Sequence, residues 1–243
     1  MDHLVDLQRD GLVRSVSGKN FPPTMLRSIH GCGFRLDSHQ MDCNLLTNPN
    51  PWNAEHRSAA SDLELPTLFS NPLAGGLLTN RFENQLFPPL ESELETATSH
   101  EQLSRSLWKW ALARSKKPND VPSSKKQQDF WTWNQYQNNL LPVLYDIARK
   151  YEVGVATVAL RWLYQMDQAR GVVVGCNLMV DPDDIRKERE IRQRIKSWRK
   201  TFTFELDKDD IESINEIGGS GLDRSLEDDM NINDMMRNKK LWL

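Results

Sequence analysis

The sequence contains few cysteines and no closely spaced pair of them. Cys32, Cys43 and Cys176 lie far apart among 243 residues, and no CxxC motif occurs. Isolated cysteines in odd number exclude a disulfide framework and a zinc site of the usual spacing, and they suit a reducing compartment. The five histidines share no spacing either, so neither a metal site nor a catalytic triad is expected.

Signature motifs and long apolar runs are also missing. The chain has no HExxH, Walker, GxSxG or GxGxxG motif. No segment approaches the length of a membrane span, so a membrane is not an expected partner. The formal net charge of −3 gives no reason to expect nucleic acid as a partner. A chain of this length is long enough for one large α/β domain or two small ones.

The stretch from Asp10 to Phe21 organises the prediction of the fold. Gly11 is expected to end a first helix, and residues 12–17 have the apolar alternation of a core strand. A loop then leads into a new helix after two prolines, which is the rhythm of a parallel sheet. Such sheets place ligands at the carboxyl ends of their strands, so Lys19 and Asn20 are the first site candidates. The alternative is that both are ordinary polar residues of a loop.

The same patterns predict the remaining elements. Strands are expected over residues 35–42, 65–70 and 171–175, the last covered on both faces. Helices are expected over residues 24–29, 54–62, 140–151 (bent near Pro142), 157–165, 182–199 and 208–217, with Asp207 as the last N-cap. In the first helix and the strand after it, the expected buried residues are Leu4, Leu7 and Leu12. In the helix over residues 182–199 they are Ile185, Ile191, Ile195 and Trp198. Residues 80–134 are expected to form a long insertion, and 220–243 an acidic, Met-rich tail.

Two loops could receive an anion. Residues 71–76 include adjacent glycines, which let backbone amides approach a phosphate. The helix that follows Gly175 offers free N–H groups at its start. That helix is strongly basic, although its interleaved Glu188 and Glu190 also fit an ordinary solvated face.

Taken in order, these motifs resemble the second half of an aldo-keto reductase. Residues 10–21 resemble the Gly-Lys-Ile-Arg…Gly-Val-Ser-Asn-Phe strand of that family, and residues 38–40 fall where it has Asn-Gln. Residues 72–79 are close to its Pro-Leu-Ala-Gly-Gly-Leu-Leu-Thr, and 155–163 with 171–175 resemble its last helix and strand. The region around Trp131 and Trp133 resembles a plant and algal-type branch. The resemblance spans about residues 2–218.

The resemblance implies an α/β fold, namely part of a (β/α)8 TIM barrel with roughly strands 5–8. It also implies NADP(H) as cofactor and a small-molecule carbonyl substrate. Asn20 and Gln40 match positions that hold the nicotinamide carboxamide. The full set of implied cofactor-binding residues is Asn20, Gln40, Asn71, Leu73, Gly75, Gly175, Cys176 and Asn177.

Several departures from the family pattern predict weakened or lost cofactor binding. Lys19 replaces a serine, and Ser70 replaces the aromatic residue on which the nicotinamide stacks. Asn177 stands where this branch has arginine, and Glu188 stands where the family has an asparagine near the adenine. The catalytic Asp, Tyr, Lys and His of the family belong to the first four strands, so no catalytic residue can be assigned here.

The sequence therefore predicts an NADP(H)-dependent oxidoreductase of the aldo-keto reductase type, inactive as this chain. The alternative is a non-catalytic pseudoenzyme or regulatory subunit built on the same barrel. Half a barrel has two unpaired edges, which predicts instability, an edge-pairing homodimer or a longer parent protein. A cytoplasmic location is expected, or an organelle if a transit peptide precedes the chain.

Overall fold

The computed structural model describes residues 2–47, 52–83, 136–167, 169–175 and 185–220. Most of the expected insertion, the loop at 48–51 and almost all of the expected tail lie outside these residues. Cys176 and Asn177 also lie outside them.

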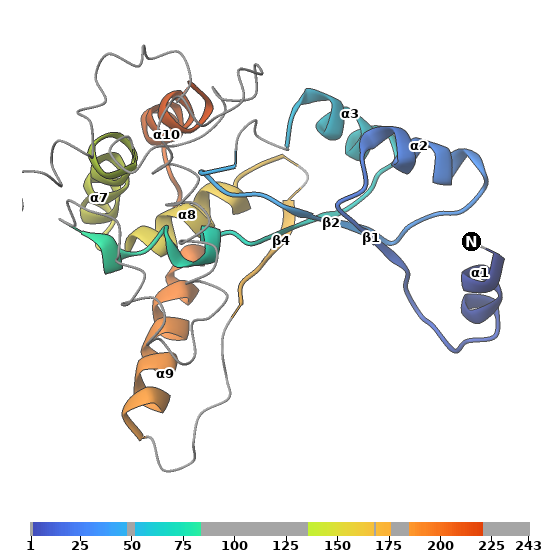
Figure 1. Cartoon of the computed structure of the whole chain (residues 1–243), viewed down its shortest axis with the longest axis horizontal. Coiled ribbons are helices and arrows are strands. Elements are labelled where there is room, and N and C mark those ends of the chain that lie inside the picture. The colour runs from blue at the N-terminus through green and yellow to red at the C-terminus, as the bar shows by residue number, and fades with distance from the viewer. Residues whose placement is uncertain (1, 48–51, 84–135, 168, 176–184, 221–243) are drawn as a thin grey trace, which may run out of the picture.

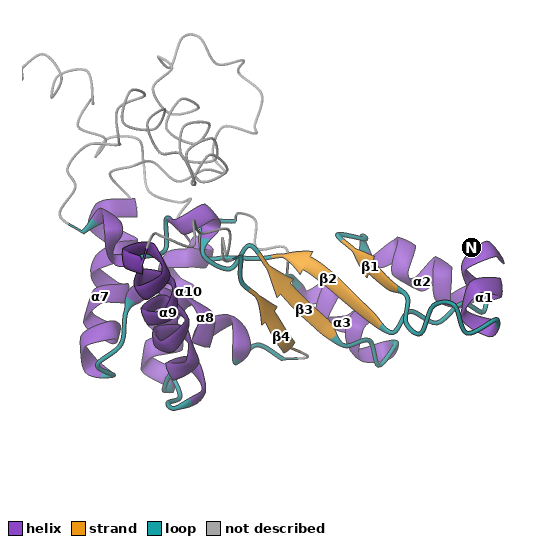
Figure 2. Ribbon diagram, turned by 90° about the horizontal axis from the view of Figure 1, so that it is seen from below, coloured by secondary structure: helices purple, strands orange, loops and turns teal. Residues whose placement is uncertain are grey.

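The described part of the chain is built around one parallel sheet. Its strands are β1 (Ser17–Lys19), β2 (Ser38–Asp42), β3 (Thr67–Ser70) and β4 (Ala169–Val173). They lie side by side in chain order, each parallel to its neighbour (Figure 2). The helices between them make each crossover, so the fold is α/β, as expected.

Helices gather at both ends of this sheet (Figure 1). At one end lie α1 (Asp2–Arg9), α2 (Pro23–Gly31) and α3 (Ala54–Asp62). At the other lie α7 (Leu141–Lys150), α8 (Val155–Tyr164), α9 (Ile185–Arg199) and α10 (Lys208–Ser220). Short 3-10 turns follow β3 and α9, and a π-helical turn, Tyr136–Leu140, precedes α7.

The two faces of the sheet differ in burial. His39, Met41 and Phe69 point to one face and are all at most 3 % exposed, because that face packs against the helices. On the opposite face the alternate residues Gln40 and Asp42 are only half-buried. Side chains alternate along a strand, so one face carries the core and the other is left open.

Most helices are confirmed close to their predicted bounds. Gly11 has φ +72°, the left-handed conformation that ends a helix at low cost only for glycine. Helix α3 has the expected bounds, and Asn53 caps it by accepting a hydrogen bond from the His56 N–H. The Asp207 cap is also confirmed, since its side chain accepts from the Asp210 N–H at 2.9 Å. Pro142 lies in the first turn of α7, directly after the π-helical turn, rather than within a longer helix.

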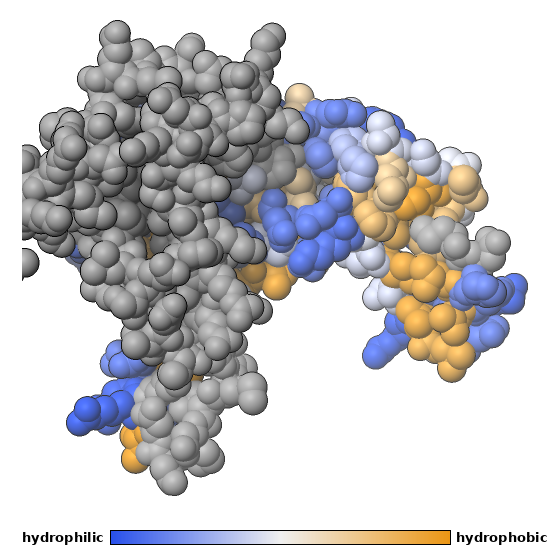
Figure 3. All heavy atoms as spheres, viewed as in Figure 1, coloured by the Kyte–Doolittle hydropathy of each residue, from blue (hydrophilic) through white to orange (hydrophobic). Residues whose placement is uncertain are grey.

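The prediction of a core strand over residues 12–17 is wrong. The strand is β1, and the N–H groups of Leu12 and Val13 instead donate to the Leu7 carbonyl at the end of α1. Leu12 is 73 % exposed, and Leu4 and Leu7 are exposed as well, against expectation. Figure 3 shows these apolar side chains gathered at the surface over α1. Only part of the apolar alternation is used: Val16 packs against the cluster of Leu26, Phe34, Leu36 and Leu65, whereas Leu12 stays exposed.

The predicted burial of β4 and α9 is also wrong in part. Val173 is 45 % exposed, so β4 is not covered on both faces. Within α9, Ile185 and Ile195 are exposed, whereas Ile191 and Trp198 are half-buried. Both elements thus present apolar side chains that no described part of the chain covers.

Candidate functional site

The candidate residues are brought together at the carboxyl edge of the sheet. Asn20 follows β1 directly, and Gln40 lies near the end of β2. The loop from Asn71 to Gly76 leaves β3, and Gly175 lies two residues beyond β4. Because parallel strands all end at the same edge of a sheet, the four segments lie along that one edge.

Asn20 is held tightly against β2. Its backbone N–H donates to the Gln40 carbonyl at 2.8 Å, and its φ of +54° is left-handed, which asparagine tolerates. Its side-chain Oδ1 accepts from the Asp42 N–H at 2.9 Å, and its Nδ2 donates to Asp42 Oδ2 at 3.1 Å. The side chain of Gln40 is half-buried on the open face of the sheet, next to the two hydrogen bonds between Asn20 and Asp42.

Asp42 connects three strand ends, and sequence reasoning missed it. Besides Asn20, its carboxylate accepts from the Ser70 hydroxyl at 2.5 Å and lies 3.9 Å from the Lys19 ammonium. The Ser70 hydroxyl lowers the pKa of Asp42 below its usual range, and the Asn20 amide and Lys19 act in the same direction. The only signal in the sequence was a carboxylate at the last position of an expected strand.

The loop after β3 offers fewer free amides than its glycine pair suggested. Gly75 and Gly76 both have positive φ, as expected of a tight turn. However, the Gly75 N–H donates to Asn71 Oδ1 at 3.0 Å and the Gly76 N–H donates to the Leu73 carbonyl at 2.8 Å. The Ala74 N–H donates to the Asn71 carbonyl. These three donors are committed within the turn, and Leu73 packs against the core.

A side-chain hydrogen bond also joins this loop to the segment after β2. The buried Asn44 donates from Nδ2 to the Asn71 carbonyl at 3.1 Å and accepts from the Leu46 N–H at 3.0 Å. The segments after β2 and β3 are therefore fixed to each other. Gly175 is exposed at the end of β4, and a Cβ there would meet nothing within 4 Å.

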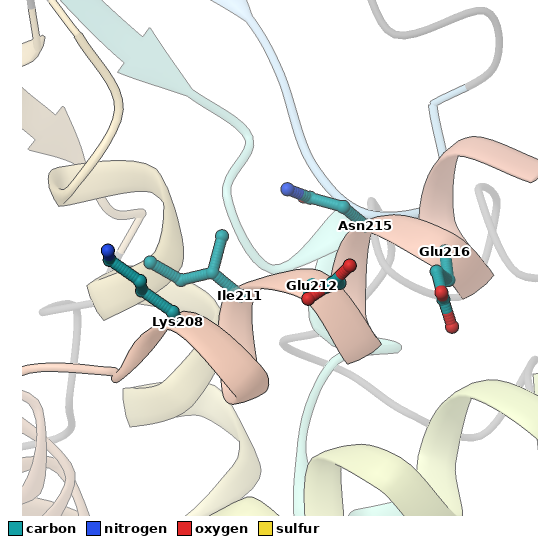
Figure 4. A pocket seen from close by; sticks show the side chains of 5 residues that line it. All are labelled: Lys208, Ile211, Glu212, Asn215 and Glu216. Atoms are coloured by element: carbon teal, nitrogen blue, oxygen red, sulfur yellow. The ribbon is translucent and has the colours of Figure 1, made fainter.

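A hollow elsewhere on the surface shares no residue with this edge. It has a volume of about 480 Å³ and is lined by Lys208, Ile211, Glu212, Asn215 and Glu216, all from α10 (Figure 4). The Asn215 amide oxygen already accepts from Trp162 Nε1 at 2.9 Å. Within the described ranges no three His, Cys, Asp or Glu side chains are placed to hold a metal ion. No helix among those same residues is both long and apolar enough to cross a membrane.

Comparison with protein families gives a match that spans most of the chain. The model of the aldo/keto reductase family matches residues 1–218. The chain belongs to the aldo/keto reductase family. A comparison with curated protein sequences gave no match.

Solved aldo-keto reductases share the fold of this chain. It is similar to the glycerol dehydrogenase AKR11B4 from Gluconobacter oxydans, with 17 % identity, a TM-score of 0.56 and coverage of 92 % of this chain and 54 % of that one. It is also similar to the thermostable aldo-keto reductase Tm1743, solved with the inhibitor epalrestat, with 11 % identity, a TM-score of 0.50 and coverage of 88 % and 52 %. The chain thus spans about half the length of the solved structures it matches.

His39 holds the segment around Asn20 from the helix-covered side of the sheet. The residue stands beside Gln40, where the resemblance to aldo-keto reductases places asparagine. Its Nε2 accepts from the Phe21 N–H at 3.1 Å, and its ring stacks on Phe21 with centroids 6.5 Å apart. Burial lowers the pKa of His39 to about 4, and His56 acts in the same direction. The fold therefore requires the neutral imidazole.

We expect the stability of the chain to fall between pH 6.5 and pH 4 because of His39. The unfolded state takes up a proton near pH 6.5, whereas the folded state does so only near pH 4. At about 1.4 kcal/mol per pKa unit, the loss is at most about 3.5 kcal/mol. Chemical unfolding at several pH values measures it.

His39→Gln is the matched variant, because a glutamine Oε1 can still accept from the Phe21 N–H. The free energy of unfolding of H39Q should depend less steeply on pH over this interval. An identical slope for both proteins would contradict the role given to His39.

Proposed function

We propose that this chain is the cofactor-binding half of an NADP(H)-dependent oxidoreductase that interconverts carbonyls and alcohols. In this proposal β1–β4 correspond to the last four strands of an eight-stranded barrel. The family match, the coverage of about half of each solved relative and the open face of the sheet all support this correspondence. Within the described residues β1 and β4 each have one neighbouring strand, as the edges of a divided barrel would.

The observation that carries the proposal is the pair of amides at Asn20 and Gln40. They lie on adjacent strands, joined by a backbone hydrogen bond of 2.8 Å, at the mouth of the sheet. Each amide has donor and acceptor capacity left for a ligand, which suits the carboxamide of a nicotinamide. The residues present therefore fit this end of the cofactor, which supplies or accepts the hydride when bound.

The phosphate end of the cofactor is supported less well. The turn after β3 uses three of its amides internally, so Asn71, Leu73 and Gly75 would line the pyrophosphate with few free donors. Glu188 lies in the first turn of α9, where its charge would oppose an adenosine phosphate. Weak binding is the expected consequence.

Titration of the chain with NADPH, followed by tryptophan fluorescence, tests the proposal. We expect quenching with a Kd in the micromolar range and a loss of about tenfold in Asn20→Ala, because one oriented amide contact to the ligand disappears. Asn53→Ala is the control, since Asn53 caps α3 away from the strand ends. An N20A chain that binds as tightly as N53A would contradict the assignment of Asn20.

The second candidate function is a non-catalytic interaction protein or regulatory subunit on the same fold. Among the residues that the structure describes, β1 and β4 each have a neighbouring strand on one side only, and α1 has exposed apolar side chains; both features favour it. Its simplest partner is a second copy of this chain, paired along those edges. The same titration separates the candidates, because failure to bind NADPH even within a completed barrel favours the interaction protein.

A further inference from the structure

The carboxylate of Asp42 is the centre of the polar network at the strand ends. Its two oxygens accept from side chains that follow or end different strands, Asn20 after β1 and Ser70 in β3. Its side chain is 46 % exposed on the open face, so it can act on a ligand bound there through its neighbours. Neither the sequence patterns nor the family resemblance singled this residue out.

Asp42 decides which way the Asn20 amide faces. The Asp42 N–H is a donor and can pair only with Oδ1, while the carboxylate is an acceptor and can pair only with Nδ2. Turning the amide over would bring donor against donor and acceptor against acceptor. Asn20 is therefore left with one N–H and one Oδ1 lone pair, at fixed positions, for a ligand.

Ser70 and Lys19 in turn hold Asp42. The Ser70 hydroxyl lies 2.5 Å from Oδ1, and the Lys19 ammonium lies 3.9 Å from the same oxygen. The carboxylate thus has a fixed rotamer and a lowered pKa, and it remains an acceptor at neutral pH.

We propose that Asp42 is a positioning residue for the nicotinamide end of the cofactor, because it fixes the orientation of the Asn20 amide that receives the carboxamide. This assignment rests on the proposed function. It predicts an effect limited to that end of the ligand, which a residue that only joins strands would not produce.

The experiment compares two ligands on the same variants. NADP⁺ carries the nicotinamide, whereas adenosine 2′,5′-bisphosphate carries only the adenosine half. In Asp42→Ala we expect the affinity for NADP⁺ to fall about tenfold, while the affinity for the bisphosphate stays within about twofold of the wild type. Isothermal titration calorimetry measures both affinities.

Two further variants separate orientation from stability. Asp42→Asn keeps an oxygen for Asn20 Nδ2, so it should restore most of the affinity for NADP⁺. Asp37→Ala removes a carboxylate that bonds the Val16 N–H at 2.7 Å at the opposite end of β2, so it should lower stability without changing ligand selectivity. Thermal unfolding of each variant confirms that it is folded.

The outcomes distinguish the assignment from the proposed function. Equal losses for both ligands in D42A, or no loss for either, would overturn the role of Asp42 while NADP⁺ binding by the wild type still supports the proposed function. A wild type that binds the bisphosphate but not NADP⁺ would overturn both. If the wild type binds neither ligand, the proposed function fails and the assignment fails with it.

Discussion

Phe69→Ala is expected to destabilise the chain by about 3–5 kcal/mol, as full truncation of a buried aromatic side chain does. Phe69 is 0 % exposed in the middle of the sheet and meets the Trp52 ring edge-on at a centroid distance of 5.3 Å. Phe69 lies on β3, which is between β2 and β4. Loosening β3 would therefore also disturb the strand ends that carry the candidate site. Chemical unfolding of the purified variant gives the value.

Leu68→Ala is the matched control, one residue earlier on the same strand. Leu68 points to the open face and is only half-buried, so its truncation should cost less than about 1 kcal/mol. In a closed barrel the same side chain would be interior, and its removal would cost about 2–5 kcal/mol. A cost for L68A close to that for F69A would show that something covers this face in solution.

The 243-residue chain, mixed with NADPH and a small aldehyde, is expected to show no turnover above the rate without protein. Carbonyl reduction needs a general acid near the carbonyl oxygen, whose contribution is about 10²–10⁴-fold. The described residues that directly follow the four strands, around Asn20, Cys43, Asn71 and Val174, include no tyrosine or histidine. The rate is measured as the decrease with time in the absorbance of the reduced nicotinamide of NADPH.

A chimera provides the positive control for that measurement. Placing the first four strand–helix units of another aldo-keto reductase ahead of Met1 should close the barrel, supply the proton donor and give turnover that Asn20→Ala lowers. If the 243-residue chain alone showed turnover and N20A did not, this would contradict the proposal that the chain binds the cofactor but does not supply the proton donor.

The elements that were predicted well are those determined by local chemistry. Helix α3 has the predicted bounds, and Asn53 caps its start by accepting a hydrogen bond from the His56 N–H. The start of α10 followed from Asp207 and the acidic first turn. Gly11 ended its helix because a left-handed residue was needed there.

The elements that were predicted poorly depend on partners far along the chain. Residues 12–17 have the pattern of a strand, but whether a neighbour pairs with them cannot be read locally, and Leu12 is exposed. The same holds for Ile185 and Ile195 in α9, whose apolar spacing implied a burial that the described residues do not supply. Apolar periodicity reports a capacity to pack, not the presence of a partner.

The candidate site divides in the same way. The position at a strand end led to Asn20, and the family resemblance added Gln40; the sheet does place the two together. It did not lead to Asp42, because the pairing of Asp42 with Ser70 depends on the register of β2 against β3. Nor could the sequence show that the amides after β3 are used within their own turn, since that depends on the backbone conformation of the turn and, for the Gly75 N–H, on the rotamer of Asn71.

Hydrogen exchange of the chain with and without NADPH tests the central claim most directly. If the strand ends form a nicotinamide cradle, slowed exchange should appear together in the peptides that cover residues 17–21, 38–44 and 70–76. Protection confined to α10, or none at any of these strand ends at saturating NADPH, would contradict it.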